Sequence, residues 1–224
     1  MTVLFDYPKK AEFNRIVPKA KFYERAKLSK AVKERFVSEV GQIVWRYKLA
    51  PETINLPARS GIQEIQVFSV TSKTENLSEE VLRAIDKAIP SPIIFEIIFE
   101  SKVRVVLAYK RQNEADSNSW VVELYVASDW LPNETKRHPL PVVLDMGSLY
   151  EQFLRSLVSI PQRSGEDLRQ LVNRVGSIRS KEIEQRRVEA KLQAEKQFNR
   201  KVELNSELRR VNSELANLRQ EIQQ

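Results

Sequence analysis

The sequence contains no cysteine and only one histidine, His138. The absence of cysteine excludes disulfides, thiol nucleophiles and thiolate metal sites. A metal centre built on imidazole is excluded as well, and a Ser-His-Asp triad would have to use His138 itself. Because His138 lies beside Pro139 in a proline-rich loop, we interpret it as an incidental surface residue and predict no metal site.

Glycine is also scarce, with five residues in 224, and neither a Walker A pattern nor a GxGxxG motif occurs. Without a glycine-rich loop to hold phosphate, ATPase and dinucleotide-dependent functions are not expected, and we predict no cofactor. No apolar run approaches the ~18 residues that span a bilayer. The first residues lack the charged-then-apolar build of a signal peptide. We therefore expect a cytoplasmic protein with no membrane partner.

Positive charge is present in excess and is unevenly placed. The net charge is +7, and residues 1–30 hold eight basic side chains against three acidic ones. Such a segment can bind phosphate backbones, although a solubilising surface is an equally open interpretation. Phe22 and Tyr23 are interleaved with these charges and either stack on bases or anchor the segment to the domain. The basic N-terminal segment comprises Lys9, Lys10, Arg15, Lys19, Lys21, Arg25 and Lys27.

The order of predicted elements indicates an α+β domain over residues 1–160. Apolar spacing predicts a helix from Ser29 to Lys48, a second from about Ser78 to Pro90, and a third over residues 148–159. Alternating or continuous apolar runs predict strands at 61–70, 92–100, 103–110 and 119–127. Ser101-Lys102 is short enough to join two antiparallel strands. We expect a mixed, mostly antiparallel sheet of about four strands with packed helices.

The C-terminal part, residues 164–224, predicts a helical arm. No proline follows Pro161, so the pattern indicates one long charged helix ending in a coiled-coil seam. The arm is free to pair with its own copy, fold back onto the domain, or dock to a different protein. The seam residues, which we predict to bind a partner, are Leu204, Leu208, Val211, Leu215, Leu218 and Ile222.

Carboxylates remain available for Mg²⁺-dependent phosphodiester cleavage, which needs converging acidic oxygens and often a nearby lysine. Asp86 followed by Glu100-Ser101-Lys102 has the acid, acid-x-lysine order of restriction-type nucleases. Glu64 and Gln66 would lie on one face of a strand. The same residues are ordinary in a turn or on a solvated strand.

Asp86 and Lys87 are charged residues inside an otherwise apolar stretch, just before a Pro-Ser-Pro turn. They either hold the corner between the second helix and the central strand or form part of a pocket at the start of that strand. We prefer the structural interpretation.

Several stretches of the sequence are distinctive when taken together. They include Lys48–Leu56, Glu64–Phe68, Leu149–Gln152 and Glu195–Asn205, and the most specific is Ile85–Phe95, IDKAIPSPIIF. With these stretches the chain resembles the bacterial domain-of-unknown-function family 4391 (DUF4391), over essentially its whole length. The resemblance implies no activity or site residue. It does imply a neighbourhood, because members of the family are often encoded beside DNA methyltransferases and helicase-like proteins of restriction or phage-defence type.

These observations favour a non-catalytic accessory or adaptor subunit of a bacterial DNA-modifying or phage-defence complex. Its arm would contact a protein partner, either a second copy or a helicase- or methyltransferase-type subunit. Its basic N-terminal segment would contact nucleic acid. The alternative is a Mg²⁺-dependent nuclease of restriction type that uses Glu64, Asp86, Glu100 and Lys102.

Overall fold

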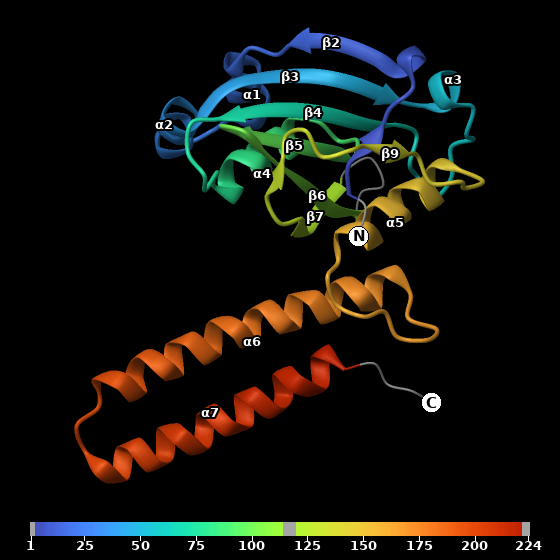
Figure 1. Cartoon of the computed structure of the whole chain (residues 1–224). Coiled ribbons are helices and arrows are strands. Elements are labelled where there is room, and N and C mark those ends of the chain that lie inside the picture. The colour runs from blue at the N-terminus through green and yellow to red at the C-terminus, as the bar shows by residue number, and fades with distance from the viewer. Residues whose placement is uncertain (1–2, 114–119, 221–224) are drawn as a thin grey trace. The chain divides into compact units, whose positions relative to one another are not determined.

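The computed structural model describes residues 3–113 and 120–220. The chain divides into two compact units, residues 1–158 and 159–224, which are described separately (Figure 1). Within the described ranges, no helix combines the length and the apolar character that crossing a membrane requires.

A mixed sheet forms the centre of the first unit, and it confirms the predicted α+β class. The strand order is β2 (Glu12–Ile16), β3 (Val40–Leu49), β4 (Ile65–Ser72), β5 (Ile93–Phe99), β6 (Lys102–Gln112) and β7 (Trp120–Ala127). Neighbouring strands are antiparallel except β4 and β5, which are parallel and are joined by the crossover helix α4 (Glu79–Ala88). The short β8 (Leu131–Pro132) pairs with β6, and β1 (Phe5–Asp6) pairs with β9 (His138–Pro139) in a separate sheet.

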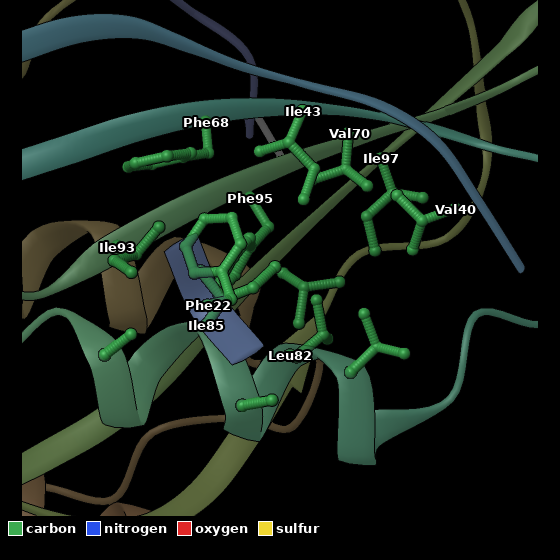
Figure 2. Close-up of a cluster of buried hydrophobic side chains, with 14 of the residues drawn as sticks. Phe22, Val40, Ile43, Phe68, Val70, Leu82, Ile85, Ile93, Phe95 and Ile97 are labelled. Carbon is green, nitrogen blue, oxygen red and sulfur yellow. The ribbon is translucent and has the colours of Figure 1, made fainter. Parts of the chain in front are cut away.

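One face of this sheet is covered by three helices, α1 (Lys19–Ala26), α2 (Lys30–Glu39) and α4. Successive side chains of a strand point to opposite faces, so Phe68 and Val70 of β4 share this side with Phe95 of β5. Figure 2 shows these strand residues facing Leu82 and Ile85 of α4. The buried apolar contacts between the three helices and the sheet form the main core of the unit.

The opposite face packs against α5 (Met146–Leu157), and the 3₁₀ turn η1 (Lys9–Ala11) and α3 (Pro51–Ile54) lie in connections near the first strands. The ring of Phe153 on α5 lies 5.1 Å from that of Phe5. Glu96 is the charged residue of the otherwise apolar strand β5. It accepts two hydrogen bonds of 2.7 Å from the guanidinium of Arg137, which also donates to the Phe5 carbonyl. This bidentate pair joins the N-terminal segment and the loop before β9 to the sheet.

An ion pair lies inside the main core. Lys110 Nζ of β6 lies 2.7 Å from Asp86 Oδ1 of α4, and both side chains are at most 1% exposed. The Tyr125 hydroxyl donates to the other carboxylate oxygen, and Lys110 also donates to the carbonyls of Ile89 and Ser91. Burial raises the pKa of Asp86 and lowers that of Lys110, while each charge opposes the shift of its partner. The preferred interpretation of Asp86, a support for the helix–strand corner, agrees with this geometry, and the residue that pairs with Asp86 is Lys110.

The expected helix from Ser29 to Lys48 is wrong in its second half. Ser29 does cap α2, through its hydroxyl and the amide of Val32, but α2 ends at Glu39 and β3 begins at Val40. The apolar spacing from Val40 onward fits a helix. The composition, rich in β-branched and aromatic residues, fits a strand, and pairing with β2 and β4 decides the outcome. The sheet is consequently larger than the four strands expected.

The second unit is helical, as predicted, but it is a hairpin of two helices, so the expectation of one continuous helix is wrong. The chain turns at Glu195–Gln197 between α6 (Leu168–Ala194) and α7 (Phe198–Arg219), and the Glu195 carboxylate accepts the amides of Lys196 and Gln197 there. Val211 and Leu215 of α7 are buried together with Ile178 of α6. Much of the predicted seam is thus buried against α6 of the same chain.

Two arginines hold the open end of the hairpin together. Arg174 of α6 donates to the carbonyls of Leu218 and Pro161 and pairs with Glu166, and Arg163 donates to the carbonyls of Asn217 and Gln220. The hydrogen bonds from Arg174 lower the pKa of Glu166. Guanidinium groups at the last carbonyls of α7 satisfy acceptors that the helix leaves free and complement its dipole.

The buried ion pair leads to a test of stability. Lys110→Met leaves the Asp86 carboxylate buried without its counter-charge, so it should lower the free energy of unfolding by about 3–5 kcal/mol in urea titrations. Asp86→Asn added to Lys110→Met should recover part of this loss, because no charge is then stranded.

Lys102→Met on the same strand is the matched control. Lys102 pairs with Glu75 at 3.7 Å and is about half exposed, so its loss should change stability by about 0.5 kcal/mol or less. A double variant as unstable as the sum of its single substitutions would contradict the stranded-charge explanation.

Candidate functional site

A cavity of about 330 Å³ opens in the first unit where β2, β3 and β4 meet α1 and the α4–β5 turn. This volume lies in the range of small-ligand sites. Its lining residues come from five separate segments of the chain: Phe13, Arg15, Ile16 and Val17; Lys21, Phe22 and Arg25; Trp45; Glu64, Gln66 and Phe68; and Ala88 to Ser91. We call this feature the β2–α1 cavity.

A bulge in β2 shapes one side of the cavity. Between Glu12 and Arg15 the register of β2 against β3 shifts, and Asn14 has a φ of +46°, a left-handed conformation that asparagine tolerates better than most residues. The Arg15 guanidinium lies over the Phe13 ring, 4.5 Å from its centroid. The bulge therefore lies at the place where Arg15 stacks on Phe13 beside the cavity.

Aromatic rings form an apolar wall. Trp45 of β3 lies between Phe13, at 4.1 Å between ring centroids, and Phe68 of β4, at 5.9 Å. Its indole N–H donates to the carbonyl of Tyr47 at 3.0 Å, which fixes the ring. Phe22 of α1 is buried and also lines the cavity. This wall is suited to a flat, apolar ring.

The structure brings together three of the seven basic residues predicted to bind nucleic acid: Arg15, Lys21 and Arg25 line the cavity. Lys21 and Arg25 are four residues apart on α1 and therefore lie on one helix face. Lys19 has a different place, because its ammonium donates to the carbonyls of Phe36 and Val40 at the end of α2, and partial burial lowers its pKa.

The remaining basic residues of the segment do not line the cavity. Lys9 and Lys10 lie in η1, and Lys27 follows α1 in a left-handed conformation. All three are exposed. Binding of nucleic acid by the seven residues stays a prediction, with Lys19 already engaged inside the domain.

Hydrogen-bonded polar side chains also line the cavity. Gln66, which is 5% exposed, shares a strand face with Phe68 and donates from Nε2 to Glu64 Oε1 at 2.6 Å. Ser91 of the α4–β5 turn donates to the same carboxylate oxygen, and Lys48 lies 3.3 Å from the other. The Gln66 carbonyl Oε1 is buried and accepts no hydrogen bond from the described residues.

The four residues of the nuclease alternative are not assembled into one site. Glu64 precedes β4 and Glu100 follows β5; since these strands are parallel, the two acids lie at opposite ends of the sheet, roughly 30 Å apart. Asp86 is buried against Lys110, and Lys102 pairs with Glu75. Within the described ranges, no three acidic or histidine side chains gather to hold a metal ion.

The predicted partner-binding seam lies in the hairpin. Val211 and Leu215 are buried, Leu218 packs against them, and Leu204 and Leu208 are half-buried. Ile222 lies outside the described residues. Binding of a separate protein by these leucines stays a prediction, whereas the apolar side chains most exposed on the hairpin are others: Ile183 (67%), Phe198 (78%) and Val202 (54%).

The sequence interpretation missed the aromatic half of the cavity, because it placed Trp45 in a helix. One local signal did point to the site: Gln66 is the polar residue of the buried run Ile65–Phe68 at the start of β4. A buried amide in such a strand needs partners that only the fold supplies.

The fold and the site define an α+β protein with a cavity that is lined by basic and aromatic side chains. A family model described as "Domain of unknown function (DUF4391)" matches residues 5–215, so the chain belongs to this family. No curated protein and no solved structure matches the chain. Two stretches that carry the family resemblance, Glu64–Phe68 and Ile85–Phe95, also supply the floor and one wall of the β2–α1 cavity.

The placement of the four nuclease candidates predicts that these residues do not cut DNA. Plasmid and linear DNA incubated with the protein and Mg²⁺ or Mn²⁺ should remain intact, because the candidate ligands Glu64 and Glu100 are too far apart to bind one metal ion. Gel analysis over a range of protein concentrations makes the measurement. Cleavage that disappears in Glu64→Gln or Asp86→Asn would establish the nuclease instead.

Proposed function

We propose that this protein is a non-catalytic accessory subunit of a bacterial DNA-modifying or phage-defence complex. In this proposal the basic N-terminal segment binds nucleic acid at the β2–α1 cavity, and the helical hairpin contacts a protein partner. The observation that carries the proposal is the convergence of Arg15, Lys21 and Arg25 on a cavity with an aromatic wall. The protein would act in the cytoplasm, where its nucleic acid and partner are found.

Electrostatics support nucleic acid as the ligand. The three cavity cations have no opposing acid among the cavity residues except Glu64, whose carboxylate is already bonded to Lys48, Gln66 and Ser91. A phosphodiester backbone provides repeated negative charge, and aromatic side chains beside basic ones are the usual means of binding single strands.

The hairpin supports the adaptor part of the proposal. Its two helices bury their own seam, yet Phe198 and Val202 on α7 and Ile183 on α6 leave large apolar side chains in solvent. Phe198 and Val202 are four residues apart and so share one face of α7, and exposed apolar side chains grouped in this way are typical of contact surfaces. The family resemblance implies a helicase- or methyltransferase-type subunit as the partner, and a second copy of the chain is the other open choice.

Binding to DNA should depend steeply on salt. If five cations of the segment meet phosphates of a single strand, the log–log slope of affinity against salt is about −3.5. Replacing Lys21 and Arg25 by glutamine should flatten the slope by about 1.4, since each phosphate contact contributes about 0.7. Fluorescence anisotropy of a labelled oligonucleotide between low and moderate salt measures both slopes.

The matched control is Lys73→Gln/Lys102→Gln, which removes the same charge. These residues lie at the other end of β4 and β6 from the cavity. Their slope should equal that of the natural protein. If this control flattens the slope as much as the cavity variant, or if the protein ignores DNA at low salt, the basic segment is a solubilising surface.

Two variants of the hairpin test the adaptor role and should behave differently. Phe198→Ser/Val202→Ser should keep the helix content measured by circular dichroism but lose complex formation with a co-expressed helicase- or methyltransferase-type subunit. Leu208→Glu/Leu215→Glu should lower helix content, because Leu215 is buried against α6. Light scattering on the purified protein tests self-association in parallel. Unchanged binding and unchanged mass in the first variant would contradict contact through these residues.

A further inference from the structure

The unpartnered carbonyl of Gln66 is the most specific feature of the β2–α1 cavity. Because the Glu64 carboxylate only accepts hydrogen bonds, the Gln66 amide nitrogen must face it, and the orientation of the amide is fixed. Oε1 is therefore held away from Glu64, in a residue that lines the cavity, without a donor among the described residues. A buried acceptor left unbonded costs free energy, which a ligand N–H at this position would recover.

We infer that the β2–α1 cavity binds a single unpaired nucleotide, with its base against the aromatic wall and an N–H of its pairing edge bonded to Gln66 Oε1. Every nucleobase carries such a donor, and in a duplex the complementary base occupies it. The phosphate would lie at Arg15, Lys21 and Arg25. Recognition of an extruded base by apolar side chains and hydrogen bonds to its pairing edge follows the same physical scheme.

Three features of the cavity fit this occupant together. Its volume of about 330 Å³ is that of a small-molecule site and excludes a double helix. Its wall is built from the rings of Phe13, Trp45 and Phe68. Cations come from α1 and β2, and the buried acceptor that lacks a donor among the described residues comes from β4. The inference rests on the proposed function for the source of the nucleotide, since the strand bound by the basic segment delivers it.

The test compares two labelled single strands of equal length and charge, one with bases and one made of abasic nucleotides. The strand with bases should bind roughly tenfold more tightly, and Gln66→Met should remove most of that difference while leaving the salt slope and the affinity for the abasic strand unchanged. Gln63→Met is the matched control, because Gln63 is exposed and does not line the cavity. Circular dichroism melts establish that both variants are folded.

A second arm uses free nucleoside monophosphates and the emission of Trp45, with Trp45→Phe as the control that loses the response. Quenching by free nucleotide without any strand binding would support the cavity and overturn the proposed function. Equal, salt-dependent binding of the strand with bases and the abasic strand would overturn the cavity inference and leave the proposed function standing. If neither strand nor free nucleotide binds, both are wrong.

Discussion

Lys110 and Asp86 meet in the core of the first unit, and the position of the α4–β5 corner depends on this ion pair. The low dielectric of the core strengthens the attraction between the two charges, but removing them from water costs free energy. Such a pair is therefore stable only where its remaining donors and acceptors also find hydrogen-bond partners. Lys110 meets that condition with the carbonyls of Ile89 and Ser91. The cation that balances Asp86 of α4 therefore also holds the turn that forms one wall of the cavity.

The α4–β5 corner also positions the polar side chains of the cavity. The Ser91 hydroxyl, held in place by the turn, bonds to Glu64, and Glu64 fixes the Gln66 amide. Lys48 completes this arrangement on the outer side; its pKa is raised, first by the hydrogen bond to Glu52 and then by Glu64. A continuous path of polar contacts thus connects the interior of the core with Glu64 and Gln66 of the β2–α1 cavity.

The parts of the fold that sequence reasoning predicted are those that depend on local pattern. The apolar run Ile93–Phe99 is a central strand, the amphipathic stretch after Ser78 is a helix, and Ser101-Lys102 lies where two antiparallel strands join. Residues 40–49 were assigned wrongly because their spacing fits two periods at once, and only pairing with β2 and β4 selects the strand. The seam of α7 was recognised, but no local signal named α6 as its partner across a three-residue turn.

The cavity could not be predicted as a unit because its residues are brought together from segments as far apart as Phe13 and Ser91. The sequence did point to its charge, in the basic N-terminal segment, and to the Glu64-x-Gln66 pair. The sequence could not show which basic side chains line the cavity and which are bonded inside the domain. Lys19 looks the same as Lys21 in sequence, yet it is used to cap α2. That distinction arises from the direction of each side chain on one short helix.

The bulge in β2 has a consequence beyond the shape of the cavity. β2 lies at the end of the strand order, so its outer backbone groups are not paired within the described sheet. An edge of this kind invites a strand from another molecule and so leads to aggregation. The irregular register at Asn14, the charge of Arg15 and the proline at position 18 all oppose such pairing. The features that shape the β2 side of the cavity are thus also ones that disfavour the joining of copies of the chain into larger sheets at this edge.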